Sequence, residues 1–106
     1  MPDAASSKGR ILTRHPAGKT GVRIALDKYE EMRRVLLLLI PEDEAGARLK
    51  DITEQARTLL DPEVYAGASV PWYLTTVKQD LEARGLIEIV PKVRPQRLRR
   101  RPAGDS

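Results

Sequence analysis

The 106-residue chain is 41% hydrophobic and 32% charged with a formal net charge of +4, which suits one domain around a single core. The absence of cysteine excludes disulfides, thiolate metal sites and cysteine nucleophiles, and it fits the reducing cytoplasm, where we expect the protein to work. The longest apolar run, at 35–40, is far shorter than the roughly 20 residues that cross a bilayer, and the N-terminus lacks the apolar core of a signal peptide, so no membrane partner is expected.

The first quarter of the chain predicts an extended N-terminal segment. Residues 1–9 are small and polar, a composition typical of disorder. Residues 10–13 can form a short strand, and a loop rich in proline and glycine separates them from residues 22–26, where apolar side chains alternate with others. A second extended stretch is therefore expected to lead into the first helix.

Two helices are predicted in the middle of the chain, at 27–40 and 51–60. Asp27 with Glu30, and Asp51 with Glu54, have the spacing of a capping box, with aspartate in place of serine or threonine. Apolar residues then recur at helical spacing in each stretch. An acidic turn at 41–46 follows the first helix, and residues 47–49 could add a minimal strand before the second.

The stretch from 69 to 90 predicts a third helix that passes through a glycine into a strand. Ser69 can cap this helix at 69–84, and one face carries apolar residues at helical spacing: Val70, Leu74, Val77 and Leu81. Gly85 suits the end of the helix, because glycine adopts the left-handed conformation that other residues resist. Residues 86–90 are rich in β-branched side chains and form the expected strand, and residues 96–99 could return antiparallel to it.

This order of elements, together with the motif Leu81-x-x-x-Gly85-Leu86-Ile87, resembles the winged helix-turn-helix superfamily over residues 27–99. Within that superfamily the chain is most similar to the N-terminal domains of Mrr-type restriction endonucleases and to small uncharacterised bacterial proteins of the same layout. The resemblance implies an α+β fold with three helices, a short antiparallel β-sheet that includes the wing, and an extended N-terminal segment. The chain departs from the pattern in the long loop at 61–68 and in the nearly neutral third helix.

We divide the chain accordingly into three parts. Residues 1–23 are an N-terminal arm that is partly disordered, residues 24–99 are the winged-helix domain, and residues 100–106 are a disordered basic tail. The basic residues gather at the two ends: residues 1–23 carry five basic residues and one acidic, residues 92–106 carry six and one, and residues 24–91 carry eight and thirteen. Contacts with phosphate are therefore expected mainly from the arms and the wing.

The favoured function is binding of duplex DNA, as in a transcriptional regulator. The polar side of the helix at 69–84 has groups that can meet base edges or phosphates in the major groove, namely Thr75, Thr76, Lys78 and Gln79. In the wing and beyond it, the arginines expected at the DNA backbone or minor groove are Arg94, Arg97, Arg99 and Arg100. The alternative interpretation of these residues is a solvated helix face and a solubilising tail.

The alternative function is a winged-helix module that binds protein and not DNA, which the acidic body and the neutral third helix favour. Trp72 could then contact a partner, although we expect the loop at 64–65 to cover it. Leu37 and Leu38 lie off the apolar stripe of the first helix. Either the N-terminal segment covers them or they form a homodimer contact.

No enzyme, metal site or cofactor is predicted. His15 is the only histidine, and no nucleophile stands near a base or a second acid in a recognisable pattern. The Ala-Gly-Lys-Thr sequence at 17–20 looks like part of a phosphate-binding loop, but position 13, where that motif needs glycine, is Thr13. We therefore expect no catalytic residue and no metal ligand.

Overall fold

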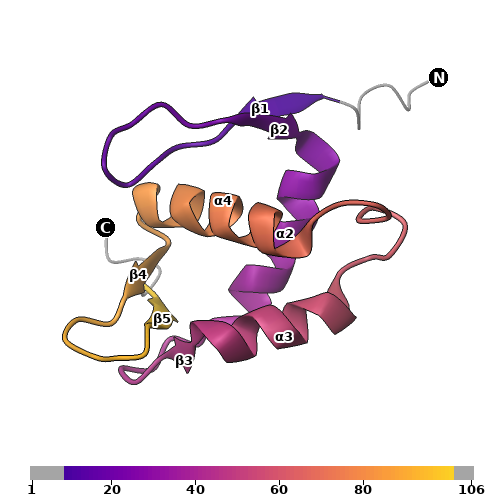
Figure 1. Cartoon of the computed structure of the whole chain (residues 1–106). Helices are drawn as coiled ribbons and strands as arrows, with labels where there is room; N and C mark the ends of the chain where they lie inside the picture. Colours follow the sequence, from indigo (N-terminus) through magenta and orange to yellow (C-terminus); the bar gives the residue numbers. More distant parts are fainter. Residues whose placement is uncertain (1–8, 102–106) are drawn as a thin grey trace.

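The computed structural model describes residues 9–101 and arranges them in eight helices and strands (Figure 1). In chain order these are β1 (Arg10–Leu12), β2 (Arg23–Ala25), α2 (Leu26–Leu39), β3 (Ala47–Arg48), α3 (Leu49–Leu59), α4 (Val70–Ala83), β4 (Ile87–Ile89) and β5 (Arg97–Arg100). The predicted α+β class, with three helices and short antiparallel sheets, is confirmed. Disorder is predicted for residues 1–9 and 100–106, of which 1–8 and 102–106 fall outside the described residues. The prediction is wrong for Arg100, which belongs to β5, and the Gly9 carbonyl accepts a hydrogen bond from Leu26.

The strands form two separate antiparallel sheets. β1 and β2 make a hairpin in which Ile11 lies opposite Ile24. The other sheet has the order β3-β5-β4, so β5 is its central strand, and Leu98 of β5 faces both Ala47 and Ile89. The returning strand expected at 96–99 is thus present, and it extends to Arg100.

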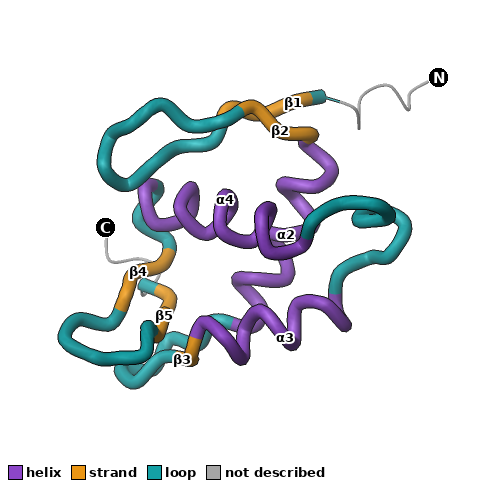
Figure 2. Tube along the Cα trace, in the orientation of Figure 1, coloured by secondary structure: helices purple, strands orange, loops and turns teal. Residues whose placement is uncertain are grey.

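The three helices pack around one hydrophobic core (Figure 2). α4 lies across α2 in this view, and α3 contacts both helices. The core residues without measurable exposure include Met32 and Leu36 of α2, and Val77 and Leu81 of α4. Buried side chains of the sheet, such as Leu98, belong to the same cluster, so the sheet is fixed to the helices and not merely attached to them.

The third helix begins and ends as the sequence indicates. The hydroxyl of Ser69 accepts a hydrogen bond from the Trp72 amide at 3.3 Å. At the other end Gly85 has a φ of +79°, and the Leu86 amide donates to the Leu81 carbonyl, which is the hydrogen bond of a Schellman motif. The chain therefore turns from α4 into β4 at the predicted glycine.

The predicted capping boxes are wrong for the other two helices. α2 begins at Leu26 and α3 at Leu49, and neither has a side chain that caps it. Each helix instead follows a strand directly, and a backbone carbonyl of a neighbouring segment satisfies the first amide: Leu26 donates to Gly9 at 2.7 Å, and Leu49 donates to Gln96 at 3.0 Å. Asp27 and Asp51 lie in the first turns, where a negative charge still favours the helix dipole.

Candidate nucleic-acid interface

The outer face of α4 is mostly polar, and its one acidic residue, Glu82, is paired with Lys78. Leu74, Val77 and Leu81 are buried, which leaves Thr75 and Trp72 exposed on the opposite side of the helix. Thr76 and Gln79 are partly exposed next to them. Three of the predicted base-contacting residues thus share one accessible face, whose hydroxyl and amide groups can both donate and accept hydrogen bonds.

Lys78, the fourth of these residues, lies apart from that face. Its side chain is 10% exposed, and its Nζ forms a salt bridge of 2.8 Å with Glu82 one helical turn later. The predicted contact of Lys78 with DNA therefore competes with a partner already in place. The same pair neutralises Glu82, which would otherwise add negative charge beside the outer face of α4.

The arginines of β5 bind the turn that follows α2. Arg97 donates to the carbonyls of Ala45 and Gly46 at 2.8 and 2.9 Å. Arg99 binds the carboxylate of Glu88 at 2.6 Å and the carbonyl of Glu44 at 3.0 Å, and Arg100 donates to Ile40 at 2.7 Å. Through these hydrogen bonds the guanidinium groups connect the central strand β5 to residues 40–46 and to β4. The structure thus gives Arg97, Arg99 and Arg100, predicted as phosphate ligands, contacts within the chain.

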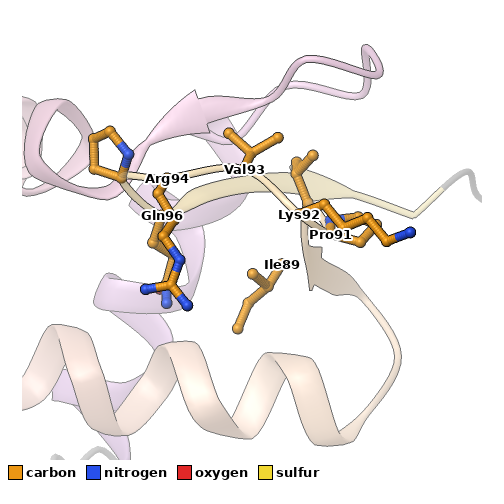
Figure 3. A pocket seen from close by; sticks show the side chains of 8 residues that line it. Ile89, Pro91, Lys92, Val93, Arg94 and Gln96 are labelled. Atoms are coloured by element: carbon orange, nitrogen blue, oxygen red, sulfur yellow. The ribbon is translucent and has the colours of Figure 1, made fainter.

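Arg94 is the predicted wing arginine that stays exposed. It belongs to the loop between β4 and β5, which encloses a hollow of about 390 Å³ lined by residues 89–96. In Figure 3 the side chains of Ile89, Arg94 and Gln96 point toward the side on which α4 lies. Lys92 is exposed on the same loop, so the loop between β4 and β5 carries two exposed cations. Gln96 also has a buried side-chain oxygen without a hydrogen-bond partner among the described residues.

Asp80 is a buried residue of α4 that the sequence did not single out and that links the helix to its neighbours. Its carboxylate is fully buried on the inner flank of α4 and accepts three hydrogen bonds: from the Tyr29 hydroxyl at 2.5 Å, from Arg84 Nε at 2.7 Å and from the Arg14 amide at 2.8 Å. Burial alone would raise the pKa of Asp80, but the three hydrogen bonds hold it below its ordinary value of 3.8. Burial and the bond to Asp80 also raise the pKa of Tyr29 to about 12.

This carboxylate joins three parts of the fold. Tyr29 comes from α2, Asp80 comes from α4, and Arg14 comes from the loop of the N-terminal hairpin. Arg84 is the residue that caps the C-terminal end of α4. The guanidinium of Arg84 also lies 5.9 Å from the centre of the Tyr29 ring. The only sequence signal was the spacing of Asp80 and Arg84, an acid four residues before a base on one helix.

The loop of the N-terminal hairpin reaches past the C-terminal end of α4, on the side opposite the wing (Figure 1). Between residues 9 and 26 the chain has four basic residues and no acidic one, and all four are exposed: Arg10, Arg14, Lys19 and Arg23. The outer face of α4 is thus flanked by two basic loops. This positive charge is evident in the sequence, but only the fold places it beside the helix.

Trp72 is 47% exposed, so the predicted cover by the loop at 64–65 is wrong. Tyr65 turns away from it, because its hydroxyl donates to the Lys28 carbonyl at 2.6 Å and its ring packs edge-on against Tyr73. The ring of Trp72 packs edge-on against Tyr73, with the ring centroids 4.9 Å apart.

Leu38 is 66% exposed, while Leu37 is partly buried against the core. The hairpin leads directly into the first residue of α2, whereas Leu38 lies at the other end of this helix and stays exposed. The hairpin therefore does not provide the cover that the sequence left open as one alternative. Within residues 9–101 no helix has the length and apolar character that a membrane span requires, and no three acidic, histidine or cysteine side chains gather as a metal site would need.

Comparison with known proteins identifies a family but no activity. A family model described as a family of unknown function (DUF6958) matches residues 10–98, from the first residue of β1 to the centre of β5. The matched range includes the N-terminal hairpin together with the three helices and the loop between β4 and β5. Neither the curated proteins nor the solved structures contained a match to the chain.

Proposed function

The chain belongs to DUF6958, a family of unknown function, and we propose that it binds duplex DNA as a winged-helix protein, in the manner of a transcriptional regulator. One observation carries the proposal: the outer face of α4, whose one acidic residue is paired with Lys78, lies between two loops that have basic residues and no acidic ones. The order of the elements and the β3-β5-β4 sheet also support kinship with the winged helix-turn-helix superfamily.

In the proposed interface, residues of α4 recognise the DNA sequence and residues of the wing bind the phosphates. Thr75, Thr76 and Gln79 present donors and acceptors that can read base edges in the major groove. Lys92 and Arg94 of the wing contact phosphates, which position a protein on DNA without reading its sequence.

The acidic residues of α4 do not oppose this arrangement. Asp80 is buried under three hydrogen bonds, and Glu82 is paired with Lys78. The negative charge of the body therefore does not appear on the face that would meet the DNA. Because β5 uses its arginines inside the sheet, the phosphate contacts come from the loops and not from the C-terminal run of arginines.

The test is fluorescence anisotropy with labelled duplexes of random sequence at about 50 and about 200 mM salt. Lys92→Ala with Arg94→Ala should reduce the slope of log affinity against log salt by about 1.8, which is 0.9 for each phosphate contact. Thr76→Ala with Gln79→Ala should lower discrimination between selected and random duplexes and leave the slope nearly unchanged. The proposal fails if the wild type binds no duplex at tens of micromolar protein in about 50 mM salt, where non-specific binding is expected.

The exposure of Leu38 and Trp72 favours a second candidate, a module that binds protein. Large apolar side chains with this exposure are candidate contact points in an interface. Leu37 and Leu38 on α2 would then meet a second copy of the chain, and Trp72 would meet another partner. Sedimentation tests this dimer, because a homodimer through α2 should become monomeric in Leu38→Glu, and a wild type that is monomeric at high concentration rules that dimer out.

A further inference from the structure

We infer that the N-terminal hairpin is a second DNA-contacting element, whose loop at 14–20 binds the phosphodiester backbone through Arg14 and Lys19. The inference rests on the proposed function and extends it to a segment that the sequence analysis assigned to a partly disordered arm. Three observations support it. Hydrogen bonds close the base of the loop, a hydrogen bond attaches the loop to α4, and the charged side chains of the hairpin are all basic.

The base of the loop is closed by Thr13 and Val22. The Thr13 amide donates to the Val22 carbonyl at 2.9 Å, and the Thr13 hydroxyl accepts from the Val22 amide at 3.0 Å and donates to its carbonyl at 3.1 Å. Thr13 is buried, so these bonds are sheltered from water. Next to Val22, a Cβ on Gly21 would lie 1.8 Å from the Thr13 carbonyl oxygen, so only glycine allows the two chains to approach so closely here.

The loop is attached to α4 through its first residue. The Arg14 amide donates to Asp80 Oδ1 at 2.8 Å, and Asp80 itself is held by Tyr29 and Arg84. A buried carboxylate needs its full set of donors, so losing the Arg14 bond would be costly, and the loop is held at one position along the helix. Arg14 is nevertheless an exposed residue, and its side chain therefore starts from a fixed point beside α4.

The charge of the hairpin suits an anionic polymer. Arg10, Arg14, Lys19 and Arg23 are exposed, and none forms a salt bridge with another described residue. Exposed basic side chains that have no acidic partner within the protein attract polyanions. Each contact of such a side chain with a phosphate also releases counterions from DNA.

The hairpin and the wing then contact a duplex from two sides of α4. Both loops extend past the C-terminal end of α4, and they lie on opposite sides of it (Figure 1). With the outer face of α4 in a major groove about 12 Å wide, each loop is directed toward one of the two strands that border the groove. The hairpin therefore adds phosphate contacts that a wing alone would not make.

The experiment compares two double variants that each remove two positive charges. The test variant is Arg14→Ala with Lys19→Ala, and the matched control is Lys50→Ala with Arg57→Ala, two exposed residues of α3. All four side chains are exposed, so neither variant should disturb the core, and circular dichroism will check that each is folded. Affinity for a labelled random duplex is measured across a salt series from about 50 to about 200 mM.

The test variant should reduce the salt slope by about 1.8 and weaken binding at about 100 mM salt by tens of fold, while the control stays close to wild type. The inference is overturned if the wild type binds DNA and the test variant keeps the wild-type slope, or if both variants lose affinity equally. A wild type that binds no duplex overturns the proposed function itself, so the two failures are distinguishable.

Discussion

Replacement of Asp80 by asparagine tests the contact on which the architecture of the interface depends. Asp80→Asn keeps the shape of the side chain but removes the charge, and it places an amide donor against groups that are themselves donors. The native carboxylate accepts bonds from Tyr29, Arg84 and the Arg14 amide. Hydrogen bonds to a charged group contribute about 1.5–3 kcal/mol each, and breaking a buried ion pair costs about 3–5 kcal/mol.

The exposure of the two side-chain donors indicates how much free energy of unfolding Asp80→Asn should lose. The side chain of Arg84 is 28% exposed, so it can turn toward water, whereas Tyr29 is only 5% exposed and its hydroxyl has no such escape. We therefore expect Asp80→Asn to lower the free energy of unfolding by about 2–3 kcal/mol. Tyr29→Phe, which removes one donor and leaves the other two, should cost about 1.5 kcal/mol.

The assay is urea unfolding followed by circular dichroism. A double-mutant cycle of Asp80→Asn and Tyr29→Phe should show a coupling of at least about 0.5 kcal/mol, since the two side chains are in direct contact. Glu54→Gln, an exposed acid on α3, is the matched control and should change stability by less than about 0.5 kcal/mol. If Asp80→Asn unfolds at the same urea concentration as the control, the buried network does not hold the hairpin to the helices.

The same variant makes a prediction about pH. The pKa of Asp80 in the folded protein lies below its ordinary value of 3.8. A depressed pKa of this kind contributes stability that is complete above 3.8 and is lost as the pH falls through the folded pKa. The stability difference between wild type and Asp80→Asn should therefore be constant near neutral pH and shrink in acid below about 3.8. A difference that is independent of pH in that range would contradict the assignment.

Three further predictions concern other parts of the fold. Gly85→Val should lower stability by more than about 1 kcal/mol and Gly85→Asn by less, both by thermal melting, because the φ of +79° is strained for a β-branched residue and tolerable for asparagine; equal midpoints for the two variants would contradict this. Gly21→Ala should open the base of the hairpin, because its Cβ would overlap the Thr13 carbonyl, and hydrogen exchange of the Thr13 and Val22 amides should then accelerate; unchanged protection would show that the close approach is not required. Leu38→Glu should leave stability within about 0.5 kcal/mol of wild type if α2 is free in solution, and a larger loss that depends on protein concentration would indicate a dimer through Leu38.

Local signals predicted those parts of the fold that depend on neighbouring residues. The cap at Ser69, the glycine at position 85 and the strand after it are decided within a few residues, and all three are confirmed. The caps at Asp27 and Asp51 failed for the opposite reason. The first amides of the two helices, at Leu26 and Leu49, are instead satisfied by the carbonyls of Gly9 and Gln96, which lie far away along the chain and cannot be identified from a local pattern.

In the candidate site, too, the sequence predicts what depends on neighbouring residues and not what depends on distant ones. The period of a helix places Thr75, Thr76 and Gln79 on the outer face, and the structure agrees. From the sequence alone, the arginines at 97, 99 and 100 look like free positive charges. Only the fold shows that their guanidinium groups donate hydrogen bonds to carbonyls in residues 40–46. The role of Asp80 likewise depends on Arg14 and Tyr29, which are 66 and 51 residues away.

The most direct test of the central claim is the salt dependence of wild-type binding to a random duplex. The proposed interface has four phosphate contacts, from Arg14, Lys19, Lys92 and Arg94. It therefore predicts measurable binding at tens of micromolar protein or below in about 50 mM salt, with a slope of log affinity against log salt near about −3.6. An absence of binding, or a slope near zero, would contradict the account.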